Sequence, residues 1–160
     1  MQKISITIHH SIYINRPRET VWDYTQDYSL RPDWDKTVIE AKVLQTTPQK
    51  IVELKTSGNT IMKFVYKVYD RPNKTSLALQ DIKSRRIISG GGSWNYQEKN
   101  GGTLWTQTNT LIYKPGFLNA IFMPMFRFSW KREIRKSMWR AKRNLEKVSR
   151  KWWIKNKTIK

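Results

Sequence analysis

Few side chains in this sequence could carry out acid–base chemistry on a substrate. His10 is the one polar residue on the isoleucine face of an alternating segment, where it could orient a polar ligand or bond only to backbone and water. Tyr66 and Asp81 are the other candidates for a polar group deep in a pocket. Asp81, Gln107 and Asn109 lie on predicted strands, and the face that each takes depends on strand register, which the sequence leaves open.

The motifs of the common enzyme classes are missing. His9 and His10 point to opposite faces of a predicted strand, so they form neither HExxH nor a three-histidine metal site. The absence of cysteine excludes disulfides, thiolate metal sites and a cysteine nucleophile. Asp33 and Asp35 lie in a turn that they are expected to cap, and the glycines at 90–92 lack the GxxxxGK[ST] spacing of a phosphate loop. We therefore predict no catalytic set, no metal site and no cofactor.

Aromatic residues make up 12% of the chain, and eight of them are tryptophan. Around an unfilled space they would form an apolar small-molecule pocket of several hundred cubic ångströms. Alternatively, they fill that space and leave no cavity. The predicted ligand-binding residues are Phe64, Tyr66, Trp94, Tyr96, Trp105, Phe122, Phe126, Trp130 and His10.

Positive charge dominates the composition and is concentrated near the C-terminus. The chain has 31 Lys and Arg against 12 Asp and Glu, a net charge of +19, and residues 127–160 hold 14 basic and two acidic residues. Such an excess favours anionic partners, or it serves only to keep the protein soluble.

Basic side chains cover the outer surface of the last predicted helix, and Trp139 and Trp153 lie off its apolar stripe. This pattern is typical of contact with an anionic membrane surface. It would also suit nucleic-acid phosphates, the less favoured partner, or a merely solvated helix face. The predicted anion-contacting residues are Arg135, Lys136, Trp139, Arg143 and Lys147.

Hydrophobic periodicity predicts the elements that hold these residues. Alternating isoleucines indicate a first strand over residues 3–14, Pro17 begins a short helix that runs to Tyr24, and a second turn follows at 30–35. Turn signals then separate about six strands, which implies an antiparallel meander. These strands are expected at 38–45, 51–56, 60–70, one or two within 76–88, 93–98 and 103–113.

A long amphipathic helix should follow over residues 119–155, with Pro124 breaking or kinking its start. Its apolar face recurs at spacings of three and four residues. The predicted stripe is Phe122, Phe126, Trp130, Ile134, Met138, Ala141, Leu145, Val148 and Trp152. Residues 1–155 are expected to form one α+β domain, with a frayed basic tail at 156–160.

Four stretches, taken in order, carry a resemblance to a known superfamily. They are residues 12–22, a strand that runs into a proline-started helix with Val-Trp; Arg31-Pro32-Asp33-Trp34-Asp35; Val68-Tyr69-Asp70-Arg71-Pro72; and Gly101-Gly102-Thr103 with Lys114-Pro115-Gly116 before the long helix. Together they resemble the SRPBCC superfamily, which includes START-like lipid-transfer domains, polyketide cyclase/dehydrase-like proteins and the birch-pollen-allergen fold.

The resemblance implies a helix-grip fold, in which a curved antiparallel sheet of six or seven strands wraps around the C-terminal helix. Two short helices follow the first strand. The cavity between sheet and helix holds lipids, hormones, quinones or polyketides in such proteins. Because these proteins share no single ligand-binding pattern, the resemblance carries no catalytic residues over to this chain.

Three functions follow from these observations. The leading one is binding, or transport, of a hydrophobic small molecule or lipid in the cavity. The alternatives are a polyketide cyclase/aromatase-like enzyme and a binder of nucleic acid or an acidic partner through the basic helix. The first strand has no continuous apolar run of the signal-peptide kind, and the apolar stretch at 117–126 is too short to cross a bilayer. We expect a soluble cytoplasmic protein, with peripheral contact at the membrane as the alternative.

Overall fold

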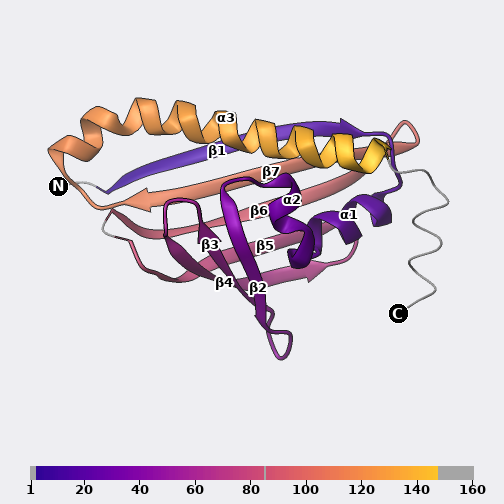
Figure 1. Ribbon diagram of the computed structural model, residues 1–160, viewed down its shortest axis with the longest axis horizontal. Helices are drawn as coiled ribbons and strands as arrows, with labels where there is room; N and C mark the ends of the chain where they lie inside the picture. Colours follow the sequence, from indigo (N-terminus) through magenta and orange to yellow (C-terminus); the bar gives the residue numbers. More distant parts are fainter. Residues whose placement is uncertain (1–2, 85, 148–160) are drawn as a thin grey trace.

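Seven antiparallel strands form a single curved sheet, and a long helix lies across one end of its concave face (Figure 1). The computed structural model describes residues 3–84 and 86–147. The strand order β1-β7-β6-β5-β4-β3-β2 and the long last helix confirm the predicted α+β helix-grip class. The elements are β1 Ile4–Ile14, α1 Arg18–Gln26, the 3-10 turn η1 Tyr28–Leu30, α2 Arg31–Trp34, β2 Val38–Gln45, β3 Ile51–Thr56, β4 Ile61–Asp70, β5 Lys74–Ile82, β6 Ile87–Lys99, β7 Gly102–Tyr113 and α3 Phe117–Lys147.

Alternation along β1 sets which face of the sheet is buried. Ile6 and Ile8 are 3% exposed, and they pair in register with Leu111 and Asn109 of β7. Successive strand residues point to opposite faces, so Gln107 and Asn109 share the concave face with these isoleucines. The register therefore shows which face of the sheet Gln107 and Asn109 take, which the sequence left open.

The glycine run at 90–92 lies inside β6, whereas the sequence placed it before a strand. A Cβ on Gly92 would lie 2.6 Å from Asn109 Oδ1, and one on Gly91 would lie 2.7 Å from the Leu77 carbonyl oxygen. Glycine is therefore needed where β6 lies close to its two neighbours. The prediction failed because three residues without side chains erase the alternating pattern that identifies a strand.

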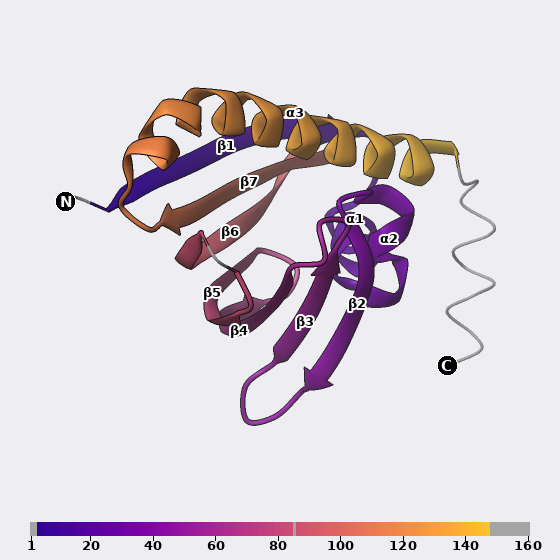
Figure 2. The same ribbon diagram turned by 60° about the vertical axis from the view of Figure 1, so that its left-hand side comes forward.

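The long helix supplies the other half of the core. Ile134, Met138, Ala141 and Leu145 are buried, which confirms this part of the predicted stripe. The helix continues through Pro124, and its first turns bend relative to the rest (Figure 2), so of the two predicted effects of Pro124 the structure shows the kink and not the break. Within the described residues, no helix is long and apolar enough to span a membrane. The remaining predictions for this region, the helix over 148–155 with Val148, Trp152 and Trp153 and the tail at 156–160, lie outside the described residues.

The buried side chains form two separate clusters. The larger cluster joins α3 to β1, β6, β7 and the short helices, and the smaller cluster lies over β3 and β4. Figure 2 shows the reason, because β1 and β7 run beneath α3 while β2 and β3 stand away from it. The two clusters therefore meet where the sheet curves away from α3.

Candidate functional site

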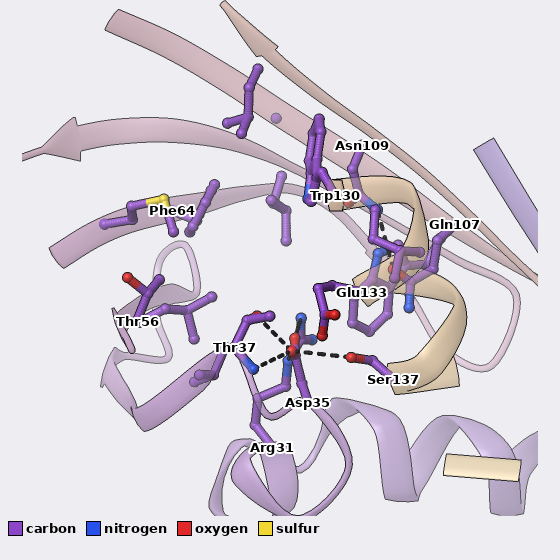
Figure 3. A pocket seen from close by; sticks show the side chains of 18 of the residues that line it. Arg31, Asp35, Thr37, Thr56, Phe64, Gln107, Asn109, Trp130, Glu133 and Ser137 are labelled. Carbon is purple, nitrogen blue, oxygen red and sulfur yellow. Dashed lines mark hydrogen bonds and ion pairs between the residues drawn. The ribbon is translucent and has the colours of Figure 1, made fainter. Parts of the chain in front are cut away.

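A cavity of about 150 Å³ lies between the two core clusters (Figure 3). The sheet lines it mainly with apolar side chains, and α3 closes it with Trp130 and Ile134. The apolar residues from the strands are Val38, Leu54, Met62, Phe64, Leu77, Trp94 and Leu111. Most of the wall can therefore accommodate only an apolar group.

Three tryptophans make this cavity smaller than the several hundred cubic ångströms predicted. Trp34 contacts Trp94 and Trp105 edge to face, with ring centroids 6.1 and 5.6 Å apart. The rings of Trp94 and Trp105 are 5.4 Å apart. Edge-to-face packing fills the closed end of the space. The two sequence-based alternatives, an aromatic pocket and an aromatic core, each describe part of this region.

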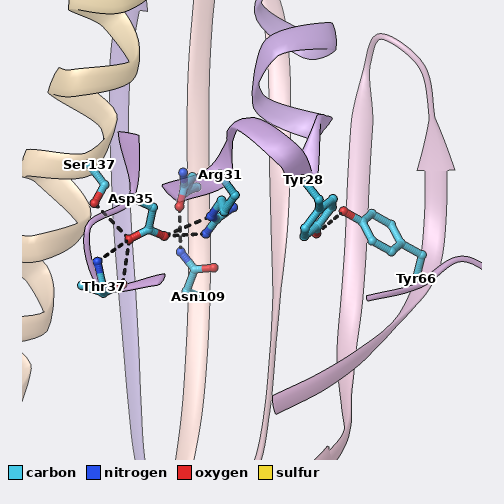
Figure 4. Close-up of polar contacts among 8 residues, drawn as sticks. Tyr28, Arg31, Asp35, Thr37, Tyr66, Asn109 and Ser137 are labelled. Atoms are coloured by element: carbon cyan, nitrogen blue, oxygen red, sulfur yellow. Dashed lines mark hydrogen bonds and ion pairs between the residues drawn. The ribbon is translucent and has the colours of Figure 1, made fainter. Parts of the chain in front are cut away.

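A buried ion pair forms one polar side of the cavity (Figures 3 and 4). Arg31 Nε and Nη2 donate to Asp35 Oδ2 at 3.0 and 2.8 Å, and the two side chains are only 12% and 11% exposed. The Arg31 guanidinium also lies 4.3 Å from the ring centroid of Trp34 and 4.9 Å from that of Trp94. The aromatic rings and the carboxylate together fix its orientation.

The other carboxylate oxygen of Asp35 ties the short helices to α3. Asp35 Oδ1 accepts hydrogen bonds from Thr37 Oγ1 at 2.7 Å, Thr37 N at 3.2 Å and Ser137 Oγ at 3.3 Å. Burial alone would raise the pKa of Asp35, but the Arg31 charge and the Thr37 hydrogen bonds outweigh it and hold the pKa below its usual value. Asp35 is thus ionised at neutral pH, and the pair adds no net charge to the cavity.

Two amide side chains on β7 form a second polar patch. Asn109 Nδ2 donates to Gln107 Oε1 at 3.1 Å, and both residues line the cavity. Gln107 is only 4% exposed. Amides can donate and accept, so this patch suits an uncharged carbonyl or hydroxyl group on a ligand.

A buried hydrogen-bond chain ends at the cavity wall with Tyr28. Tyr66 donates to Gln26 Oε1 at 2.9 Å, so the 2.6 Å bond between Tyr28 and Tyr66 must take its proton from Tyr28 (Figure 4). The chain continues through Gln26 Nε2, which donates to the Tyr96 hydroxyl at 3.0 Å, and Tyr96 bonds to Thr25 at 2.7 Å. Burial raises the pKa of Tyr66 and Tyr96, so both stay protonated. The Tyr28 proton is therefore held by Tyr66, and Tyr28 has no free proton to donate to a ligand.

The model of one protein family matches residues 5–146 of this chain. That range includes every strand of the sheet and all of the cavity lining. The chain belongs to the polyketide cyclase/dehydrase and lipid transport family. No curated protein is a significant match to the sequence.

Solved structures share the fold of this family member at low sequence identity. The Zhui aromatase/cyclase from Streptomyces sp. R1128 is 11% identical with a TM-score of 0.75, over 89% of this chain and 94% of that one. A START superfamily protein from Mycobacterium smegmatis is 12% identical with a TM-score of 0.70, over 89% and 99%. The di-domain aromatase/cyclase BexL from the BE-7585A biosynthetic pathway is 13% identical with a TM-score of 0.73, over 91% of this chain and only 51% of BexL.

The structure separates the ligand-binding residues predicted for this family member into three groups. Phe64, Trp94 and Trp130 line the cavity. Phe122 is 44% exposed and points away from the buried core. The others pack beside the cavity without lining it: Tyr66, Tyr96 and Trp105 are buried, and Phe126 is partly buried against the core.

None of the three residues predicted as a polar group deep in the cavity, His10, Tyr66 and Asp81, lines it. His10 is half-buried beside α3, where burial, followed by the charges of Arg135 and Lys131, lowers its pKa, and it does not line the cavity. Asp81 is exposed on β5, so the suggestion that it is buried is wrong. Asp35 holds its turn through Thr37 as expected, yet it also lines the cavity, contrary to the sequence-based interpretation.

Sequence reasoning missed Arg31, Asp35 and Ser137 as parts of one site. The four-residue spacing of Arg31 and Asp35, which allows contact across a helical turn, was an available signal. Ser137 was another, because it is a polar residue between the core positions Ile134 and Ala141 of one helix face.

Proposed function

We propose that this protein binds a hydrophobic small molecule or lipid whose apolar part enters the cavity and whose uncharged polar end meets Gln107 and Asn109. The observation that carries the proposal is the combination of an apolar wall with a few converging, hydrogen-bonded polar groups, which is typical of small-molecule sites. Family membership in a lipid-transport and cyclase group supports the same function.

The size and charge of the cavity limit the ligand. A cavity of about 150 Å³ is large enough for a single benzene-sized ring. The charged groups of the cavity are already paired, Arg31 with Asp35 and Glu133 with Lys136, so a charged ligand group would have no unpaired counter-charge there. The ligand portion inside the cavity is therefore a ring or a short chain segment with a carbonyl or hydroxyl group.

Blocking the cavity is expected to abolish binding. Leu111 lines the cavity, whereas Ile112 pairs with Ser5 on the other face of the sheet, so Leu111→Trp fills the space and Ile112→Trp is the matched control. Native mass spectrometry should show a co-purifying small molecule with the wild-type and Ile112→Trp proteins, and none with Leu111→Trp. Titration with the neutral dye N-phenyl-1-naphthylamine gives a second readout. Equal dye binding by both variants, or none by the wild type, would contradict the proposal.

The polar end of the cavity should discriminate between ligands that differ by one hydroxyl group. Gln107→Leu is expected to weaken binding of phenol by about 0.5–1.5 kcal/mol, the usual contribution of one hydrogen bond. Binding of benzene should stay unchanged, because it makes no such bond. Isothermal titration calorimetry with both ligands measures the difference, and a parallel loss for both would mean that Gln107 acts only on the shape of the cavity.

An aromatase/cyclase-like activity is the second candidate, and membership in the cyclase/dehydrase family favours it. The side-chain N–H groups of Gln107 and Asn109 at the cavity would stabilise, by hydrogen bonding, the enolate whose carbon attacks a carbonyl of the same polyketide to close a ring. Incubation with a linear poly-β-ketone thioester, followed by mass spectrometry and chromatography of the product, tests this activity. A ring pattern identical to the spontaneous one, with wild type and Gln107→Leu alike, would exclude it.

A further inference from the structure

The outer face of α3, opposite the face that packs on the sheet, carries two kinds of side chain in succession. Its first three turns expose an apolar end, defined as Phe117, Ile121, Met125 and Phe128, whose exposed fractions are 74%, 54%, 58% and 70%. The same face continues with a basic stretch, defined as Arg132, Arg135, Lys136 and Arg143, all of them exposed. Trp139 lies within the basic stretch and is 52% exposed.

Helical spacing places both parts on one continuous stripe. Successive members of the apolar end and the basic stretch are three or four residues apart, apart from the adjacent Arg135 and Lys136, and Trp139 fills the longer interval before Arg143. The core positions Ile134 and Met138 lie on the opposite side of the same helix. With respect to residues 3–84 and 86–147 the stripe is exposed, so it can bind a partner while α3 keeps its packing against β1.

The apolar end has no role in the core that would explain it. Soluble monomers rarely expose a contiguous apolar patch, and such a patch usually marks a protein or membrane contact. The patch lies at the end of the molecule where β1 begins and β7 ends, at the start of α3 (Figures 1 and 2). An adjacent aromatic side chain, Phe122, is also 44% exposed.

We propose that α3 docks on an anionic lipid bilayer, with its apolar end among the lipid chains and its basic stretch on the phosphates. Apolar and cationic side chains in succession on one helix face match the layering of acyl boundary and headgroups. Trp139 suits the headgroup level, because its ring is apolar and its N–H is polar. The helix thus enters obliquely, with Phe117 deepest.

The stripe fits other partners less well. Two copies of this chain that buried their apolar ends with the helices parallel would bring two basic stretches close together, which opposes association, and an antiparallel pair would leave both basic stretches unused. Nucleic-acid binding accounts for the basic stretch, but Ile121 and Met125 have no aromatic ring on which a base could stack. The stripe lies outside the cavity, so the docking proposal holds for any cavity ligand.

Flotation with vesicles tests the docking. Wild-type protein should float with phosphatidylcholine vesicles that contain about 30% phosphatidylglycerol, but not with pure phosphatidylcholine. Raising the salt concentration to about 1 M, where the Debye length is about 3 Å, should release it. Each basic residue at an anionic surface strengthens binding by roughly fivefold, so changing the four residues of the basic stretch to Ser should weaken it by roughly 600-fold.

Matched variants separate surface chemistry from net charge. A control variant loses the same number of positive charges on another surface. It changes to Ser four exposed lysines on or beside the strands, Lys67, Lys74, Lys83 and Lys99, and it should keep most of the vesicle binding. Changing Phe117, Ile121 and Met125 to Ser should weaken binding by roughly tenfold for each side chain that enters the bilayer. The control for this variant is Ile39, Val43 and Leu44→Ser, which removes exposed apolar residues from β2. The cavity variant Leu111→Trp should float like the wild type, so failure of ligand binding and failure of docking are distinguishable.

The depth to which single residues enter the bilayer can be measured with a fluorescent label, because the chain contains no cysteine and an introduced one is labelled alone. An NBD label on Met125→Cys should gain emission and shift to the blue on acidic vesicles, whereas the same label on Val43→Cys should not change. Absence of vesicle binding would overturn the proposal. The proposal would also be overturned if the wild type and the variant with Phe117, Ile121 and Met125 changed to Ser bound oligonucleotides equally tightly and neither bound vesicles. A third contrary result would be that this variant differs from the wild type only in being a monomer instead of a dimer in sedimentation velocity.

Discussion

Met138→Asp is expected to remove a large part of the free energy that stabilises the folded protein. Met138 is fully buried in the larger core cluster, among α3, β1 and the short helices. Aspartate would place an unpaired charge there, and this should cost about 4 kcal/mol or more of the roughly 5–15 kcal/mol that stabilises a typical domain. Circular dichroism during urea unfolding should show no cooperative transition, or a midpoint far below that of the wild type.

Two controls make the result specific to burial. Met138→Leu keeps the volume and polarity, so it should cost less than about 1.5 kcal/mol. Arg132→Asp places the same aspartate on the exposed face of the same helix and should cost less than about 1 kcal/mol. Wild-type thermal stability in Met138→Asp would mean that this face of α3 does not pack in the core.

Periodicity predicted the parts of the fold in which side chains alternate clearly. The isoleucines of β1, the strands at 38–45 and 51–56 and the Ile134 to Leu145 face of α3 all lie where their spacing placed them. Along β1, β3 and α3 one face is more buried than the other, so burial is recorded in the spacing of the apolar residues. The strand at 38–45 was instead delimited by the turn signal that follows it, because its Ile39, Val43 and Leu44 are all exposed. Pro17 added a helix-start signal that needs no tertiary information.

The cavity could not be predicted in the same way, because its limits are set by contacts between distant segments. Asp35 gave a local signal for a turn, which its bonds to Thr37 confirm, but its contact with Ser137 joins residues 102 positions apart. Trp94 and Trp105 looked equivalent in sequence, yet only Trp94 lines the cavity. Which aromatic ring fills the space and which borders it depends on the curvature of the sheet, which single residues do not encode.

Removing the Asp35 carboxylate should be the other strongly destabilising change. Breaking a buried ion pair costs about 3–5 kcal/mol, because the remaining charge, here Arg31, stays buried without its partner. Asp35→Ala also leaves Thr37 and Ser137 without their shared acceptor. Urea unfolding should show this loss, whereas Asp33→Asn, an exposed carboxylate in the same turn, should change the stability by less than about 0.5 kcal/mol.

A double replacement tests whether the loss comes from the orphaned charge. Arg31→Met combined with Asp35→Leu removes both charges and fills the space with apolar atoms. The double variant should be more stable than Asp35→Ala, since replacing a buried ion pair by apolar residues of similar volume is often nearly neutral. A strictly additive double-mutant cycle would show that the two side chains do not interact.

The pH dependence of stability gives an independent measure of the same carboxylate. The pKa of Asp35 is lower in the folded protein than the unfolded value near 3.9, so the unfolded chain binds its proton at the higher pH. The stabilisation from Asp35 is therefore fully present above about pH 5, and it is lost as the pH falls below about 4 toward the folded-state pKa. Asp35→Asn should be less stable than the wild type at pH 7, and the difference should shrink in acid. A constant difference from pH 7 to pH 3 would mean that Asp35 does not titrate with a lowered pKa, and that the ion pair with Arg31 is not what holds this side of the cavity.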